Sequence, residues 1–76
     1  MKELIETIAR ALVEQPDDVE VREFDAEDTT VVELKVAPDD VGKVIGRQGR
    51  TIKAMRTLLH AASIKSNRRT QLEVIE

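Results

Sequence analysis

Between residues 41 and 55, glycines and basic side chains are spaced in a way that suits an anionic ligand. The segment reads VGKVIGRQGRTIKAM and contains no acidic residue; its basic residues are Lys43, Arg47, Arg50 and Lys53. Because glycine has no β-carbon, Gly46 and Gly49 allow an elongated ligand to lie against the main chain. Amides at the start of a helix near Arg50 point toward such a ligand with the positive end of the helix dipole. This pattern predicts phosphate binding.

The distribution of charge along the chain supports the same interpretation. The net charge is -3, yet residues 1–42 hold thirteen acidic and four basic residues, whereas residues 43–69 hold eight basic residues and no acidic one. This asymmetry predicts a basic face for a polyanion. Two glycines alone are a weak signal, because a helix-to-helix turn flanked by solvated arginines has the same sequence. Both interpretations remain open at this point.

Few residues have the chemistry of a catalytic or metal site. The chain has one histidine, two serines and no cysteine, and its carboxylates lie mostly outside the basic segment. His60 falls on the outer side of a predicted helix, where a surface role is expected. Asp39 and Asp40 have the oxygen ligands of a cation site, but a helix cap explains them more simply. We therefore expect no enzyme activity, no cofactor, no metal and no small-molecule substrate.

The apolar pattern predicts the elements that position the basic segment. Apolar residues recur at intervals of three and four before Pro16, which indicates a first helix. Alternating residues predict strands at 19–24 and 29–36, joined by a turn at 25–28. Pro38 stops the second strand, and an aspartate at 39 or 40 is expected to cap a short helix that begins near Val41.

A longer helix is predicted to resume near Arg50, followed by a last strand around Leu72 and Val74. The apolar side of this helix is formed by Ile52, Met55, Leu59 and Ala62. The order helix, strand, strand, helix, helix, strand predicts an α+β fold in which the first two strands pair antiparallel and the last is parallel to the second. The sheet is then three-stranded and mixed, with three helices on one face, in a single domain spanning residues 1–76.

The composition limits where the protein works and how it recognises a ligand. Hydrophobic residues make up 41% and charged residues 36% of the chain, which is typical of a soluble domain. Charged residues interrupt the N-terminal apolar stretch, so we expect no signal peptide or membrane span. The absence of cysteine gives no support for a secreted, disulfide-bonded domain, so we expect a cytoplasmic location. Phe24 is the only aromatic residue. Nucleic-acid recognition would therefore rest on phosphates rather than base stacking, with strong salt dependence and weak sequence preference.

The residues Val44-Ile45-Gly46-Arg47-Gln48-Gly49-Arg50-Thr51-Ile52 resemble the Ile-Gly-x-x-Gly-x-x-Ile signature of KH domains, and the element order is similar to the type II form. The resemblance covers essentially all 76 residues. The acidic N-terminal helix and the VAPDDVGKVIGRQGRTIKA block are more closely similar to the KhpA family of small bacterial single-domain RNA-binding proteins. The resemblance implies a type II KH domain that holds about four nucleotides of single-stranded RNA.

The resemblance also implies roles for individual residues. Contacts with the sugar-phosphate backbone are expected from Gly46, Arg47, Gln48 and Gly49, with further phosphate contacts from Lys43, Arg50 and Lys53. Ile45 and Ile52 would shape the floor of an apolar groove, although both also fall on the stripe that the core requires. Arg68 and Arg69 are candidates for a second edge of the groove, or for a solvated loop.

An interaction module with little intrinsic RNA binding is the competing hypothesis. Ala54, Leu58 and Ala61 form a small apolar strip beside the core stripe, which suits either a dimer contact or the margin of the core. The resemblance to the KhpA family implies a homodimer, pairing with a larger Jag-like KH protein, and a role as RNA chaperone or post-transcriptional regulator linked to cell elongation and division.

Overall fold

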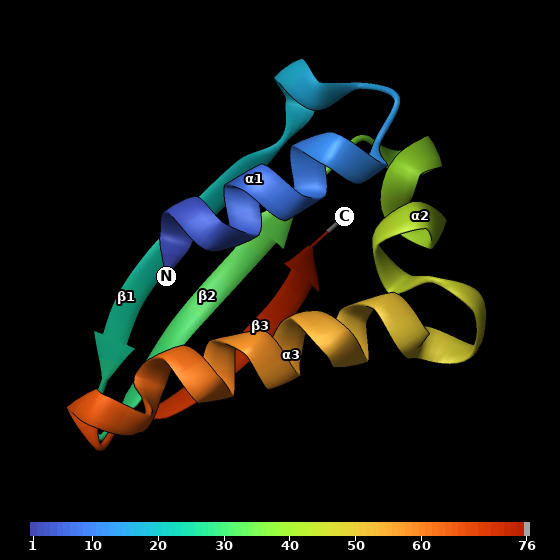
Figure 1. Ribbon diagram of the computed structural model, residues 1–76. Coiled ribbons are helices and arrows are strands. Elements are labelled where there is room, and N and C mark those ends of the chain that lie inside the picture. The colour runs from blue at the N-terminus through green and yellow to red at the C-terminus, as the bar shows by residue number, and fades with distance from the viewer. Residues whose placement is uncertain (76) are drawn as a thin grey trace.

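The computed structural model describes residues 1–75 and has the element order that the sequence predicts (Figure 1). The helices and strands are α1 (Lys2–Leu12), β1 (Glu20–Ala26), β2 (Thr29–Lys35), α2 (Val41–Ile45), α3 (Arg50–Ser63) and β3 (Arg69–Ile75). Single 3-10 turns at Pro16–Asp18, Pro38–Asp40, Arg47–Gly49 and Ile64–Ser66 connect them. The predicted α+β class and the αββααβ order of a type II KH fold are confirmed.

The sheet has the order β1-β2-β3, with β2 in the centre. β1 pairs antiparallel with β2, placing Val21 opposite Leu34, and β2 pairs parallel with β3, placing Val32 opposite Leu72. A two-residue turn suffices for the first pairing, whereas a parallel pairing requires a crossover, which α2 and α3 supply. The predicted mixed topology is therefore confirmed.

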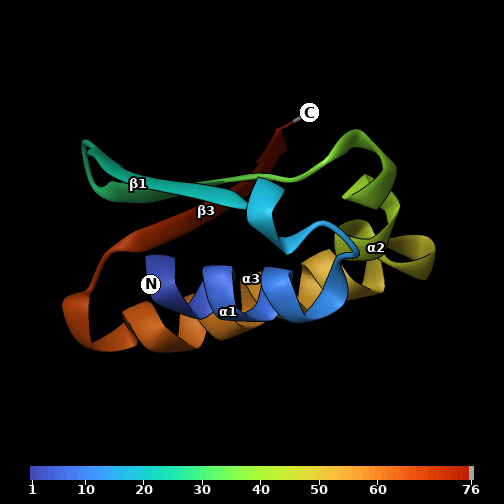
Figure 2. The same cartoon turned by 90° about the horizontal axis from the view of Figure 1, so that it is seen from above.

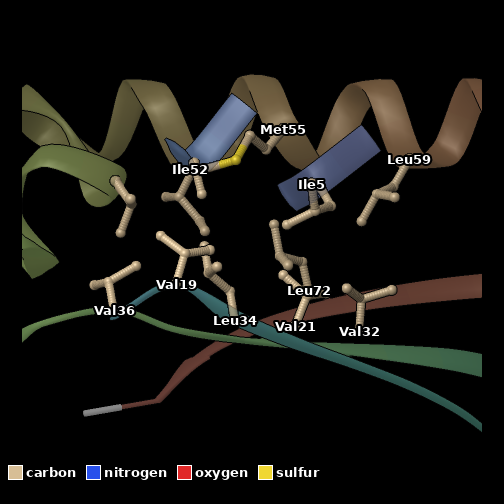
Figure 3. Packing of buried hydrophobic residues seen from close by; sticks show 12 residues of the cluster. Ile5, Val19, Val21, Val32, Leu34, Val36, Ile52, Met55, Leu59 and Leu72 are labelled. Carbon is tan, nitrogen blue, oxygen red and sulfur yellow. The ribbon is translucent and has the colours of Figure 1, made fainter. Parts of the chain in front are cut away.

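The helices cover one face of the sheet, and the core lies between the two layers (Figure 2). Ile5 of α1 and Met55 and Leu59 of α3 point toward side chains of the sheet, including Leu34 and Leu72 (Figure 3). Helical spacing places the buried residues of each helix on one stripe, and strand alternation places the buried residues of each strand on one face of the sheet. Burial of these apolar surfaces is the main force that holds the layers together.

Three details of the elements differ from the sequence-based expectation. β1 continues to Ala26, so its turn comprises only residues 27–28, and β2 ends at Lys35. Ala62 was expected in the buried stripe of α3 but is exposed, and Ser63 is buried in its place. Ser63 follows Leu59 by four residues and so stays on the same face. Its hydroxyl donates to the carbonyl of His60 at 2.9 Å, which satisfies the buried polar group.

The expectation that an aspartate side chain caps α2 is wrong. Asp40 is 1% exposed, and its carboxylate accepts hydrogen bonds from the backbone N–H groups of Glu14 at 3.2 Å and Gln15 at 3.0 Å. Within residues 1–75, no side chain makes a cap bond at the start of α2. Asp40 instead fastens the chain that follows α1 to the beginning of α2, and so it fixes the helix that carries the glycine segment.

No helix among residues 1–75 is long and apolar enough to cross a membrane. The same residues contain no group of three or more histidine, cysteine, aspartate or glutamate side chains able to hold a metal ion.

Candidate nucleic-acid interface

The segment from Gly46 to Gly49, here called the GRQG loop, makes a tight connection between α2 and α3 (Figure 1). Gly46 has φ 78° and ψ 169°, a backbone region that is essentially restricted to glycine. A β-carbon on Gly46 would also lie 2.3 Å from Oγ1 of Thr51. The fold therefore requires glycine at this position, whatever the loop binds.

The other two glycines of the segment leave main chain open to solvent. Gly49 has φ 72°, and a β-carbon there would meet only Ile52, at 4.0 Å. A β-carbon on Gly42 would have no neighbour within 4 Å. Gly42 lies in α2, where glycine costs up to about 1 kcal/mol relative to alanine and packing does not require it. This arrangement favours close approach of a ligand to the main chain, and the sequence-based site omits Gly42.

Around the GRQG loop, most basic side chains point away from the core. Arg47, Arg50 and Lys53 are exposed, and within residues 1–75 none of the three forms an ion pair. Arg50 donates to Oε1 of Gln48 at 3.3 Å, so two of the predicted contact residues hold each other. Lys43 differs, because its Nζ lies 3.6 Å from Oε1 of Glu14.

Ile45 and Ile52 belong to the packing of the domain. Ile52 is 5% exposed and lies in the core cluster, and Ile45 is partly buried against that cluster. Ile45 directly precedes the GRQG loop and Ile52 follows it by three residues, so their packing anchors the chain on both sides of the loop. Ile52 therefore lies in the core and Ile45 at its edge, and a further role in the floor of a groove stays a prediction.

A groove of about 630 Å³ lies between α3 and β3. Its lining residues are Arg56, Leu59, Thr70, Gln71, Leu72, Glu73 and Val74. α3 begins at the GRQG loop and runs beside β3, as Figure 1 shows, so the groove and the loop share one helix. β3 is an edge strand, and an edge strand presents unpaired backbone donors and acceptors. The groove therefore offers both apolar surface and hydrogen-bonding groups.

Arg56 is a groove residue that the sequence-based site does not include. One of its guanidinium nitrogens donates to the carbonyl of Leu72 at 3.2 Å, which holds the side chain against β3. In the sequence, only its position within residues 43–69, which hold no acidic residue, marks Arg56 as a candidate for RNA contact. Only the packing of α3 beside β3 distinguishes Arg56 from the other cations of the same helix.

Arg68 is held at the other end of the sheet. Its guanidinium donates to Oγ1 of Thr30 at 3.1 Å and to the carbonyl of Glu27 at 3.2 Å, and it lies 3.4 Å from a carboxylate oxygen of Asp25. Arg68 thus fastens the chain before β3 to the β1–β2 hairpin. Arg69 is exposed nearby. Neither residue lines the groove between α3 and β3.

The small apolar strip on α3 faces solvent. Leu58 is 47% exposed, and Ala54 and Ala61 are exposed as well. Core packing therefore does not account for these side chains in the described protomer. A dimer contact through this strip stays a prediction, because exposure alone does not identify a partner.

Comparison with known proteins places this geometry in a family. Residues 2–74 match the family model described as KhpA/KhpB, KH domain. "RNA-binding protein KhpA" of Clostridium acetobutylicum is 55% identical over 75 residues, covering 99% of this chain and 100% of the relative. The protein of the same name from Halalkalibacterium halodurans is 54% identical over 76 residues, covering all of both chains.

A solved structure shows the same fold at low sequence identity. A crystal structure of Era from Aquifex aeolicus aligns with a TM-score of 0.63 and 19% identity, covering 96% of this chain and 28% of that chain. At that identity the similarity concerns the fold alone. Together with the full-length matches above, the element order and the Gly-x-x-Gly loop lead to one conclusion: the chain belongs to the KhpA/KhpB family of KH domains.

Proposed function

We propose that this protein is a single KH domain that binds single-stranded RNA, with the sugar-phosphate backbone against the GRQG loop and bases in the groove between α3 and β3. The observation that carries this proposal is the open main chain at Gly49, beside three exposed cations that form no ion pair within residues 1–75, namely Arg47, Arg50 and Lys53. The relatives named RNA-binding protein KhpA support it over the full length of the chain.

Phosphate recognition follows from the geometry of the loop. Gly49 has no side chain and its β-carbon position is nearly open, so a phosphate can approach the amides at the start of α3. Arg47 in the loop and Lys53 in α3 add exposed positive charges. Gly42, one α2 turn earlier, extends the open surface toward the next phosphate. The loop can hold a backbone in this way without reading any base.

Base recognition in the groove is expected to be weak. Phe24 is 42% exposed but lies on β1 three residues beyond the buried Val21, so it points to the face of the sheet opposite the helices. The groove lining therefore offers no aromatic ring on which a base could stack. Arg56 and the edge of β3 provide hydrogen-bonding groups, and the affinity is dominated by phosphate contacts.

The direct test compares RNA binding of the parent with that of an Arg47→Asp/Gln48→Asp variant. Fluorescence anisotropy with a short unstructured RNA measures the affinity, and circular dichroism checks the fold. Both residues are exposed, so two new carboxylates should repel phosphate and leave the core intact. Lys2→Glu/Ala11→Glu makes the same change in net charge on the exposed face of α1 and serves as the control. Equal affinity of the folded loop variant and the parent would refute the proposal.

We propose that this protein acts in the cytoplasm as an RNA chaperone or a post-transcriptional regulator. Weak binding to the RNA backbone without base preference is compatible with either role. A link to cell elongation and division follows from the family resemblance. A strand-annealing assay with two complementary RNAs tests the chaperone role, and the loop variant should abolish any acceleration that the parent gives.

Self-association is a second candidate function, favoured by the exposed strip on α3. Ala54 and Ala61 are small enough to let another helix approach closely, and Leu58 offers apolar surface between them. The partner is a second copy of this chain or a Jag-like KH protein. In a dimer the GRQG loops of both subunits could act on one RNA, so this candidate adds to RNA binding and does not replace it.

A further inference from the structure

Lys43 is the only cation near the GRQG loop that is paired with a carboxylate within residues 1–75. Its Nζ lies 3.6 Å from Oε1 of Glu14, while Arg47, Arg50 and Lys53 have no ion-pair partner in the same part of the chain. Glu14 comes from the chain just after α1, far from the loop in sequence. One carboxylate thus pairs with one of the four basic side chains of residues 41–55.

The main chain of Glu14 is anchored at this place. Its N–H donates to the buried carboxylate of Asp40 at 3.2 Å, and the N–H of Gln15 donates to the same carboxylate at 3.0 Å. Val13, the residue before, packs against the core. The backbone of Glu14 is therefore held beside α2, although its side chain is 76% exposed and free to leave Lys43.

We propose that Glu14 competes with the RNA phosphate for Lys43 and thereby lowers the affinity of the protein for RNA. This inference rests on the proposed RNA binding. In the free protein Lys43 contacts the carboxylate, and on binding it exchanges that carboxylate for a phosphate oxygen. The displaced carboxylate remains nearby as a negative charge, which opposes the bound strand and favours its release.

The change Glu14→Gln isolates this contact, because it removes the charge and keeps the size of the side chain. The backbone bonds to Asp40 do not involve the side chain of Glu14 and should persist. Exposed ion pairs are weak, so we expect RNA affinity to rise by about 1.5- to 5-fold. The slope of log K against log salt should steepen by up to about 0.7, because no freed carboxylate then takes up a counterion when Lys43 contacts the phosphate of a single strand.

A matched control and a second background separate this local effect from the change in net charge. Glu3→Gln removes one negative charge from the opposite end of α1, where Glu3 is 89% exposed and lies 3.9 Å from the terminal amine. Fluorescence anisotropy with the same unstructured RNA should give a clearly larger gain for Glu14→Gln than for Glu3→Gln. In a Lys43→Gln background, the gain from Glu14→Gln should shrink to that of the control.

Each outcome decides between competition at Lys43 and a different origin of the affinity. Equal gains for Glu14→Gln and Glu3→Gln, or a gain that persists without Lys43, would overturn the competition. RNA binding through the GRQG loop would still stand in that case, provided that Arg47→Asp/Gln48→Asp abolishes binding. If the parent itself binds no RNA, the proposed function fails and the competition fails with it.

Discussion

A β-carbon added to Gly46 would lie 2.3 Å from Oγ1 of Thr51 and 2.8 Å from its backbone nitrogen. The second contact is with main chain, so a change of side-chain rotamer cannot relieve it. Because Thr51 lies in the first turn of α3, the chain that leaves α2 at Gly46 passes close to the start of α3. The glycine is therefore a requirement of the fold as well as part of the proposed phosphate site.

Gly46→Ala should destabilise the domain. Its backbone conformation alone costs a non-glycine residue about 1–3 kcal/mol, and the clash with Thr51 adds to that cost. Urea unfolding followed by circular dichroism measures the loss. Gly49→Ala is the matched control, since its β-carbon is in ordinary contact and only the positive φ costs about 1–2 kcal/mol. Equal stability of the Gly46→Ala variant and the parent would contradict the model of the loop.

Gly42→Ala should stabilise the protein and weaken RNA binding at the same time. A β-carbon at this position meets no atom within 4 Å, and alanine favours helix over glycine by up to about 1 kcal/mol. If the open main chain serves the RNA backbone, a methyl group there obstructs it. Parallel measurements of urea midpoint and anisotropy separate the two effects. Unchanged affinity would remove Gly42 from the proposed interface.

Removing the carboxylate of Asp40 should destabilise the connection between α1 and α2. Asp40→Ala leaves the N–H groups of Glu14 and Gln15 without their acceptor, and each charge-assisted hydrogen bond contributes about 1.5–3 kcal/mol. Asp39→Ala, at an exposed position in the same turn, should change the free energy of unfolding by less than about 0.5 kcal/mol. Similar urea midpoints for the two variants would show that the buried carboxylate contributes little.

The hydrogen-bond partners of Asp40 could not be predicted from the sequence. Proline followed by two aspartates before a helix is a local pattern, and a local cap is the interpretation that it favours. The carboxylate instead serves backbone groups some twenty-five residues earlier in the chain. Such a partner depends on how α1 docks beside α2, and no spacing in the sequence encodes that contact. The same holds for Arg56, whose acceptor Leu72 becomes a neighbour only when β3 forms beside α3.

The order and topology of the elements, by contrast, were predictable. Periods of about 3.6 and 2 residues in the apolar pattern separate helices from strands, and the length of each connection decides between antiparallel and parallel pairing. Ala62 was predicted to be buried in place of Ser63 because buried positions on a helix recur every three or four residues. Both residues therefore fit the stripe that contains Leu59. Ser63 occupies the buried position, since its hydroxyl can donate to the helix backbone.

RNA binding should depend strongly on salt. Three cations at the loop, Arg47, Arg50 and Lys53, are exposed, and each phosphate contact on a single strand contributes about -0.7 to the slope of log K against log salt. A slope near -2 is therefore expected from anisotropy titrations over a range of salt concentrations. Lys53→Gln should reduce the slope by up to about 0.7. A flat salt dependence would exclude recognition through phosphates.

Ala61→Glu should convert a dimer to a monomer if the strip on α3 forms the interface. Ala54 and Ala61 permit close helix contact, and a carboxylate buried between two helices without a partner is strongly unfavourable. His60→Glu is the control, since His60 is also exposed on α3 but lies about 100° around the helix from Ala61. Light scattering coupled to gel filtration gives the mass of each variant, and circular dichroism checks the fold. A parent that is monomeric, or a folded Ala61→Glu variant with the mass of a dimeric parent, would eliminate this interface. If only Ala61→Glu dissociates, contact with the partner subunit explains why Leu58 is exposed in a single chain. The RNA affinity of the monomeric variant then shows how much the second GRQG loop of a dimer contributes to RNA binding.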